Sequence, residues 1–357
     1  MASASYTFSG STIPVGLGNA GSLAEAVANI NLIYHKYLED WVSKYSKMKE
    51  FYQLRYEGPG AGVDFTVSES ITGSGVAHET DENAEPWIGD ISPGYSKNVT
   101  VRERTYSLAL TWFFTYHNKY PQQEMNIIKG AADACGNRME FDMAAPFTYC
   151  TSTTYTNIDG RSVNVASGDG LALAHASHTV RNASATYRNR IATDPQISRG
   201  SIEIGENLFR QQMIDNNGNP VVVEPDCIVT ASDQVTFNIA NQLMRSTSPV
   251  DAPNSSVNNP YQGQYRVIRA ASIDRTFSVG GKSFTFDSTK QKQWMLVDSR
   301  NSGLYLIVTM YPTVQSPTEA NGGVQFLTGQ RTWKAHSVYE PVALDPRFCV
   351  ISVVTTS

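Results

Sequence analysis

The clearest structural signal in the chain is the stretch of residues 121–146, PQQEMNIIKGAADACGNRMEFDMAAP. Pro121 suits the first turn of a helix, where a missing backbone N–H costs no hydrogen bond, and Pro146 is expected to end the helix. A helix of about 24 residues is roughly 36 Å long, which is more than most globular domains need. The stretch therefore predicts one unusually long helix. Its apolar positions recur at the spacing of one helical face, at Met125, Ile128, Ala132, Cys135, Met139 and Met143.

A second helix is expected near the N-terminus, after a small, polar and Gly-rich arm at residues 1–20. Ser22 and Glu25 have the spacing of a capping box at its start. Such a helix packs its apolar face against a partner, which is either another part of this chain or a neighbouring copy. The apolar face is rich in large aromatic residues and comprises Val27, Ile30, Tyr34, Tyr37, Leu38, Trp41 and Tyr45.

Two extended runs between these helices predict a long β-hairpin. The first covers residues 63–76 and the second residues 95–115, and in both runs apolar residues alternate with polar ones. An isolated two-stranded ribbon is marginally stable in water, so the outer half of the hairpin should lie on another surface. This is a physical argument for assembly. The tip between the runs is acidic, with Glu79, Asp81, Glu82 and Glu85.

The rest of the chain predicts a mixed segment followed by strands, and so an α+β fold. Residues 148–200 are polar and rich in turns, and a helix is expected at residues 202–213. Another helix should begin after Ser232 or Asp233, which suit its N-cap. The expected strands are 221–223, 228–229, a hairpin that turns at Gly280-Gly281, 294–297, 304–308, 324–327 and the segment from Trp333 to the C-terminus.

Composition argues against several classes of protein. Charged residues make up 17% of the 357 residues, against roughly 25% in an average globular protein. A chain that covers much of its surface with copies of itself needs fewer charges. The net charge is −5, and no run of Lys or Arg is long enough for electrostatic binding of nucleic acid. The N-terminus does not read as a signal peptide, and no apolar run of about 18 residues predicts a membrane span.

Motifs for catalysis or metal binding are weak. The stretch from Gly16 to Gly21 matches the dinucleotide pattern G-x-G-x-x-G, but Pro14 and its neighbours make a poor buried strand before it. His175 and His178 could share a metal with Asp169, yet no Cys or Glu completes the ligand set. We therefore expect no catalytic residues, no metal and no cofactor, with a nucleotide-binding enzyme as the alternative. Reduced, buried thiols are expected at Cys135, Cys150, Cys227 and Cys349.

Three stretches carry a resemblance to a known family. The sequence GDGL at residues 168–171, with His175 or His178 shortly after, is similar to the Asp-Gly-x-x-Leu…His stretch of Mu-like phage head subunits. The sequence VEPDCIV at residues 223–229 resembles their central block, although Ala231 stands near the place of its second Pro.

The third stretch is residues 328–338, which contains Arg331 and Trp333 and is similar to the terminal Arg/Trp strand of that family. The order of the expected elements from about residue 60 onward matches as well. The chain thus resembles the Hong Kong ninety-seven fold of tailed-phage major capsid proteins. This fold has an N-terminal arm, an extended β-hairpin loop, a long spine helix, and peripheral and axial domains.

The resemblance implies a structural protein and not an enzyme. It implies a major capsid (head) protein that self-assembles as hexamers and pentamers into the icosahedral shell around a tailed phage's double-stranded DNA, without sequence-specific binding. It implies a scaffolding protein and a portal as partners, allows a decoration protein, and involves no membrane. The subunit would be made in the bacterial host cytoplasm and end in the virion capsid. Another phage structural role, in a tail or as a decoration protein, is a further alternative.

The resemblance also divides the chain and suggests contacts between subunits. The acidic tip would lie near basic groups of a neighbour, or else it is a solvated loop. The expected contact residues are Glu79, Asp81, Glu82, Glu85, Arg102, Arg104, Arg331 and Trp41. The implied parts are an arm and helix (1–58), an extended loop (59–112), a peripheral domain (113–204 and 301–357, with a spine helix at about 121–145) and an axial domain (205–300).

Overall fold

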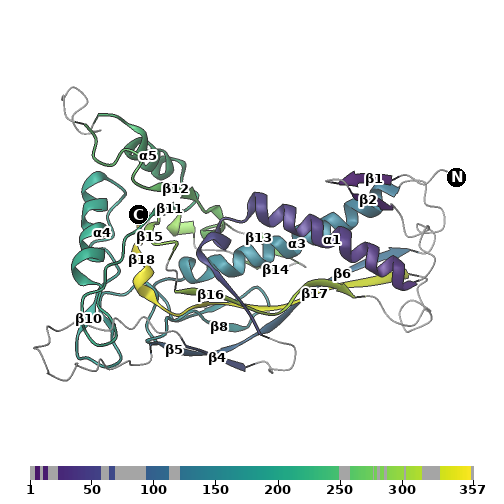
Figure 1. Ribbon diagram of the computed structural model, residues 1–357, viewed down its shortest axis with the longest axis horizontal. Helices are drawn as coiled ribbons and strands as arrows, with labels where there is room; N and C mark the ends of the chain where they lie inside the picture. The colour runs from purple at the N-terminus through teal and green to yellow at the C-terminus, as the bar shows by residue number, and fades with distance from the viewer. Residues whose placement is uncertain are drawn as a thin grey trace, which may run out of the picture.

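The computed structural model describes residues 5–8, 11–14, 23–57, 64–68, 94–111, 121–248, 258–275, 277–279, 282–284, 288–300, 303–315 and 330–354. Within them the chain forms an elongated α+β molecule. Two long helices lie along a sheet of long strands, and a smaller lobe of helices and short strands stands at one end (Figure 1). The expected strand at 324–327, the acidic tip and the Gly16–Gly21 loop lie outside the described residues.

The long helix is α3, Pro121–Thr148, and the prediction that Pro146 ends it is wrong. A proline removes one helical hydrogen bond, because it has no N–H to donate. The helical path nevertheless continues through Pro146, and the Tyr149 amide donates to the Ala145 carbonyl at 2.9 Å. The next residue, Phe147, is fully buried, so the packing of this last turn outweighs the lost hydrogen bond.

The N-terminal helix is α1, Leu23–Tyr45, which packs along α3. Tyr34, Leu38 and Trp41 of its aromatic face are buried in one cluster with side chains of α3. The partner of this face is therefore this chain's own long helix. The α3 members of the cluster are Ile128, Ala131 and Ala132, with Ile127 and Cys135 at its margin.

Both helices contact a four-stranded sheet of order β3-β16-β17-β6. The strands are β3 (Gln53–Tyr56), β16 (Leu304–Gln315), β17 (Gln330–Ala343) and β6 (Arg102–Thr111). β16 runs parallel to β3, and the other neighbouring pairs are antiparallel. This sheet joins the start of the chain to its end.

The hairpin consists of β4 (Asp64–Ser68) and β5 (Ser96–Thr100), which pair only with each other among the described strands. The sequence suggested that the second extended run is one strand, but the structure divides it into β5 and β6. It breaks at the buried Val101, after which β6 leaves the hairpin and pairs with β17. Long-range pairing of this kind leaves no local sequence signal.

The hairpin lies on the face of the sheet opposite to the long helices (Figure 1). Tyr305 and Ile307 of β16 belong to the cluster that the base of the hairpin buries. Leu304, Leu306 and Val308 alternate with them and belong to the cluster that includes the C-terminal half of α3. Successive side chains of a strand point to opposite faces, so β16 separates the hairpin from α3.

The lobe at the end of the molecule contains a second four-stranded sheet, of order β12-β11-β15-β18. Every residue of β11, β15 and β18 is buried, which explains their continuous apolar sequences. Two helices, α4 (Arg199–Gln212) and α5 (Gln234–Arg245), contact strands of this sheet. Asp233 caps α5 as expected. The strands are β12 (Arg266–Arg269), β11 (Cys227–Thr230), β15 (Trp294–Val297) and β18 (Cys349–Ser352).

The buried strand expected at residues 221–223 is wrong. No strand forms there, and Val222 is 85% exposed. Pro220 and Pro225 flank the segment, and proline cannot donate to a strand ladder, so the apolar run stays in an irregular connection.

The remaining elements are short. The hairpin expected at Gly280-Gly281 is confirmed by the pairing of β13 with β14. The N-terminal arm contains an antiparallel hairpin of β1 and β2. The short strands are β1 (Ser5–Phe8), β2 (Ser11–Pro14), β7 (Thr154–Thr156), β8 (Ser162–Asn164), β9 (His178–Thr179), β10 (Thr186–Tyr187), β13 (Phe277–Val279) and β14 (Lys282–Phe284), and the 3₁₀ turns are η2 (Met48–Phe51), η3 (Ala271–Ile273), η4 (Ser288–Lys290) and η5 (Pro346–Phe348).

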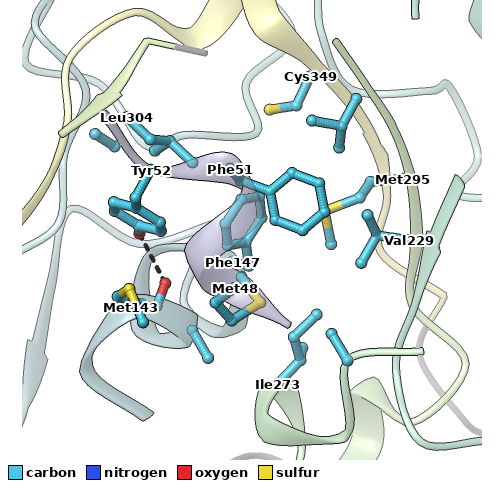
Figure 2. Close-up of a cluster of buried hydrophobic side chains, with 14 of the residues drawn as sticks. Met48, Phe51, Tyr52, Met143, Phe147, Val229, Ile273, Met295, Leu304 and Cys349 are labelled. Carbon is cyan, nitrogen blue, oxygen red and sulfur yellow. Dashed lines mark hydrogen bonds between the residues drawn. The ribbon is translucent and has the colours of Figure 1, made fainter. Parts of the chain in front are cut away.

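One hydrophobic core joins the two sheets through the end of α3. Figure 2 shows Phe147 of α3 next to Phe51 of η2, and their ring centroids are 6.4 Å apart. The Tyr52 hydroxyl donates to the Met143 carbonyl at 2.7 Å and ties η2 to the helix. Met295 and Cys349 approach the same core from the second sheet. The lobe and the helical body are therefore packed together and share this core.

Candidate assembly interface

Trp41, expected at a contact between subunits, is instead buried within the chain. Its side chain is 9% exposed and lies over Gly136 of α3. A Cβ atom at Gly136 would lie 2.4 Å from Cε3 of Trp41, so the two helices approach as closely as a glycine allows. Trp41 thus holds α1 on α3.

Arg104, a second expected contact residue, has its partners inside the chain. Its Nε donates to Asp142 Oδ2 at 3.0 Å and its Nη2 to Glu340 Oε2 at 2.9 Å. Its guanidinium also lies 4.2 Å from the ring centroid of Tyr339. Burial on its own lowers the pKa of Arg104, but Asp142, Tyr339 and Glu340 together raise it above its usual value. This charge ties β6, α3 and β17 together.

The other expected contact residues are only partly described. Arg102 donates from Nη2 to the Ser162 carbonyl at 3.1 Å, across to β8. Arg331 lies on β17, where it pairs with Leu110 of β6, and its side chain lies outside the described part. The four acidic residues of the tip lie outside it as well, so their contacts stay a prediction.

The Asp169–His178 pair, which the sequence suggested as part of a metal set, forms a buried hydrogen-bonded network. Nδ1 of His178 lies 2.7 Å from Asp169 Oδ2, and Nε2 lies 3.0 Å from Asn189 Oδ1. Asn189 is oriented by its own donors, which reach the carbonyls of Leu173 and Pro346. Within the described residues no group of three His, Cys, Asp or Glu side chains could hold a metal ion.

Lys97 fastens the base of the hairpin to the body of the subunit. Its Nζ donates to the carbonyls of Asn164 and Ala166, in and after β8. Burial lowers the pKa of this amine to about 8. The hairpin is therefore anchored twice, by Lys97 and by the apolar cluster that contains Val67, Tyr95 and Val99.

A groove of about 660 Å³ lies where α1, α3 and η3 meet. Its aromatic lining includes Tyr37, Trp41, Tyr45 and Phe141. Its acidic lining residues are Asp40, Asp133 and the buried Glu140, whose carboxylate already accepts hydrogen bonds from Ser46 and Ser272 and from two amides. Five basic residues exceed these three acids, namely Lys44, Lys47, Lys129, Arg269 and Arg275.

Sequence reasoning did not find this groove, because its basic residues come from three separated segments and form no run. A signal that could have found it is the uneven distribution of charge along the chain. Residues 56–96 contain eight acidic residues and no Lys or Arg. An acidic segment at an interface is usually matched by a basic surface on its partner, so such a surface could have been sought elsewhere in the chain.

All four cysteines are free; Cys150, Cys227 and Cys349 are buried, and Cys135 is partly so. Among the helices as far as they are described, none has both the length and the hydropathy that crossing a bilayer requires.

No protein-family model and no curated protein matches the chain. Solved structures resemble it in overall arrangement. A virus-like particle from Pyrococcus furiosus shares 8% identity with it over 91% of this chain and 98% of its own, with a TM-score of 0.46. A chain of Gordonia phage Cozz shares 11% over 87% of both chains, with a TM-score of 0.48. The capsid of the cyanophage P-SCSP1u shares 10% over 88% of this chain and 89% of its own, with a TM-score of 0.49.

Proposed function

We propose that this chain is the major capsid protein of a tailed phage and self-assembles into the icosahedral shell around the double-stranded DNA genome. The observation that carries the proposal is the arrangement of the described elements. A long helix lies along a sheet of long strands, a smaller lobe stands at one end, and a hairpin pairs with no other described strand. This is the arrangement that the resemblance in sequence leads us to expect.

Uncovered sheet edges support a self-assembling role. β3 and β6 are the outer strands of the long sheet, and each leaves one edge without a strand partner among the described residues. On β3, Leu54 is 47% exposed and Tyr56 is 62% exposed. Monomeric proteins usually protect such edges, because open edges and apolar side chains invite pairing with other chains. In a shell, neighbouring copies would cover them.

The parts of the subunit follow from this proposal. The β4–β5 hairpin is the extended loop, α3 is the spine of the peripheral domain (113–204 and 301–357), and residues 205–300 form the axial domain. The two domains interlock, since α4 crosses the boundary between them and β18 completes the sheet of the axial domain. Arg102, Arg331 and the acidic tip are the contact residues that we keep, while Arg104 and Trp41 act within the subunit.

The proposed partners are other copies in hexamers and pentamers, a scaffolding protein, a portal and, in some shells, a decoration protein. The proposed place is the virion capsid, after synthesis in the bacterial host cytoplasm, and the role is structural. The alternative nucleotide-binding reading has weak support. β2, which precedes the Gly16–Gly21 loop, pairs antiparallel with β1, whereas a dinucleotide fold needs a parallel strand there.

Sedimentation of the purified chain, alone and with a candidate scaffolding protein, tests the proposal, together with negative-stain microscopy of the fast fraction. Closed shells, or sheets and tubes of hexameric rings, are the expected result. A small compact species under both conditions would count against the proposal.

A deletion tests the interlocking role of the hairpin. Val67 and Tyr95 are core residues, so the deletion should replace only residues 69–93, with a short Gly-Ser linker. We expect this variant to fold, because β4, β5 and Lys97 remain, yet to fail to close stable shells. Normal shells from the folded variant would show that assembly does not need the outer part of the hairpin.

A further inference from the structure

The hairpin segment and the rest of the chain carry opposite charge. Residues 56–96 contain eight of the 33 acidic residues and none of the 28 Lys and Arg residues. Removing those eight charges from a chain of net charge −5 leaves +3 on the remainder. At the centre of the segment, four acids fall within seven positions, from Glu79 to Glu85, and Trp87 follows shortly after.

The groove between α1, α3 and η3 has the matching chemistry. Its cations come from all three sides: Lys44 in the last turn of α1 with Lys47 just before η2, Lys129 on α3, and Arg275 just after η3. Lys47, Lys129 and Arg275 are exposed, and none has a carboxylate within ion-pair distance among the described residues.

The groove also offers aromatic surface for an aromatic residue. Tyr45 lines it and is 54% exposed, and its ring centroid lies 5.8 Å from that of the buried Trp41, which supports it from within the subunit. The Lys44 amine lies 5.2 Å from the centroid of the Tyr45 ring. A peptide with several carboxylates and one large aromatic side chain fits a site of this composition.

Topology favours a second copy as the source of the peptide. The hairpin leaves the subunit on one face of the long sheet, where its base packs on Tyr305 and Ile307. The groove lies on the opposite face, with α1 and α3 (Figure 1). The acidic segment would have to pass around the sheet to reach its own groove, whereas a neighbouring copy can offer a groove directly.

We propose that this basic groove is the docking site for the acidic segment around Glu79–Trp87 of a second copy of the chain. The inference rests on the proposed function, because it requires assembled copies. It adds to that function a binding site for the hairpin tip. The cations of this site are the groove residues, and not Arg102, Arg104 or Arg331. Each exposed ion pair contributes little alone, and repetition around closed rings makes the contact effective.

The test is carbodiimide crosslinking of shells assembled from equal amounts of ¹⁵N-labelled and unlabelled chain, followed by mass spectrometry. The expected result is crosslinked peptides that join Lys47 or Lys129 to Glu79, Asp81, Glu82 or Glu85. Mixed-isotope pairs should be present, because the linked residues come from different copies. Crosslinks found only within one isotope would show that each chain fills its own groove, and would overturn the proposal.

Charge reversal provides the matched controls. Lys47→Glu with Lys129→Glu should lose these crosslinks, and its shells should fall apart at a lower salt concentration. Glu82→Lys with Glu85→Lys should have the same defect, and all four changes in one chain should restore the shells. Arg161→Glu changes an exposed charge on the β7–β8 turn, outside the groove, and should leave both readouts unchanged.

The two proposals fail in different ways. Stable shells without these crosslinks, and insensitive to the Lys47 and Lys129 reversals, would overturn the docking site and leave the capsid role intact. Absence of any assembly by the unaltered chain, with or without a scaffolding protein, would overturn the capsid role and the docking site together.

Discussion

The imidazole of His178 lies 2.7 Å from the carboxylate of Asp169, and the two side chains are 0% and 1% exposed. Both ring nitrogens of His178 face acceptors: Asp169 Oδ2 at Nδ1, and the oxygens of Asn189 and Leu173 at Nε2. This buried hydrogen bond fastens the loop that contains Asp169 to β9.

Removal of either partner should be strongly destabilising. His178→Ala leaves the buried Asp169 carboxylate without one of its hydrogen-bond donors, which costs at least about 1–3 kcal/mol for a buried group left unsatisfied. The double variant with Asp169→Ala should lose less than the sum of the two single variants, because the contact is broken only once. Urea unfolding of the assembly-free subunit measures this, and strictly additive losses would contradict the coupling.

The same carboxylate predicts a dependence of stability on acid pH. Burial alone raises the pKa of Asp169, but hydrogen bonds from His178, Ser167 and the Leu171 amide lower it below its usual value. As the pH falls, the unfolded chain therefore binds a proton at Asp169 before the folded chain does. The stabilisation is present above the usual aspartate pKa and is lost as the pH falls through the lower pKa of the folded state. The free energy of unfolding of the wild type should fall more steeply than that of Asp169→Asn between about pH 4 and pH 2. Parallel curves would show that Asp169 does not titrate in this range.

Arg104 should contribute more to stability than a surface arginine with similar contacts. Arg104→Met leaves Asp142 and Glu340 without their shared partner in a site where the side chains are 8% and 7% exposed. We expect a loss of about 3–5 kcal/mol. Arg199→Ala, which breaks the exposed pair with Glu203 on α4, should cost about 0–1 kcal/mol. Equal losses in chemical denaturation would contradict this reading of Arg104.

Two glycines of α3 should respond to alanine in opposite directions. Gly136→Ala places a methyl group 2.4 Å from the Trp41 ring, and we expect overpacking to cost about 1–3 kcal/mol. Gly130→Ala meets nothing within 4 Å and should stabilise the helix by about 0.5–1 kcal/mol. Thermal unfolding of the two variants checks both signs, and a tolerant Gly136 would mean that α1 can move away from α3.

Lys97 predicts a dependence of stability on alkaline pH. Burial lowers the pKa of its amine from 10.5 to about 8. Between these values the unfolded chain binds the proton and the folded chain does not, so folding stability rises with pH through this window. Lys97→Met also loses the hydrogen bonds to Asn164 and Ala166, but it has no charge to titrate. The difference in unfolding free energy between wild type and Lys97→Met should therefore change between pH 8 and 10.5, and a constant difference would refute the prediction.

Much of the helical structure follows from local sequence. The long helix, the helix capped by Asp233 and the turn at Gly280-Gly281 all appear where they are expected, because apolar spacing, caps and turn residues act over a few positions. The failures are local signals that tertiary packing overrode. Pro146 stays within α3 because its neighbour Phe147 is buried in the shared core, and Val222 stays exposed between two prolines.

The sequence by itself determined the long helix, the helix capped by Asp233, the acidic segment and the low overall charge, since these are properties of neighbouring residues. Only the tertiary structure decided which charges meet. Arg104 and Glu340 are 236 positions apart and form an ion pair because β6 adds to β17. The basic groove collects Lys44, Lys129 and Arg275 from three segments that carry no common pattern. The physical reason is that strand pairing and helix packing bring together residues whose separation along the chain leaves no periodic trace.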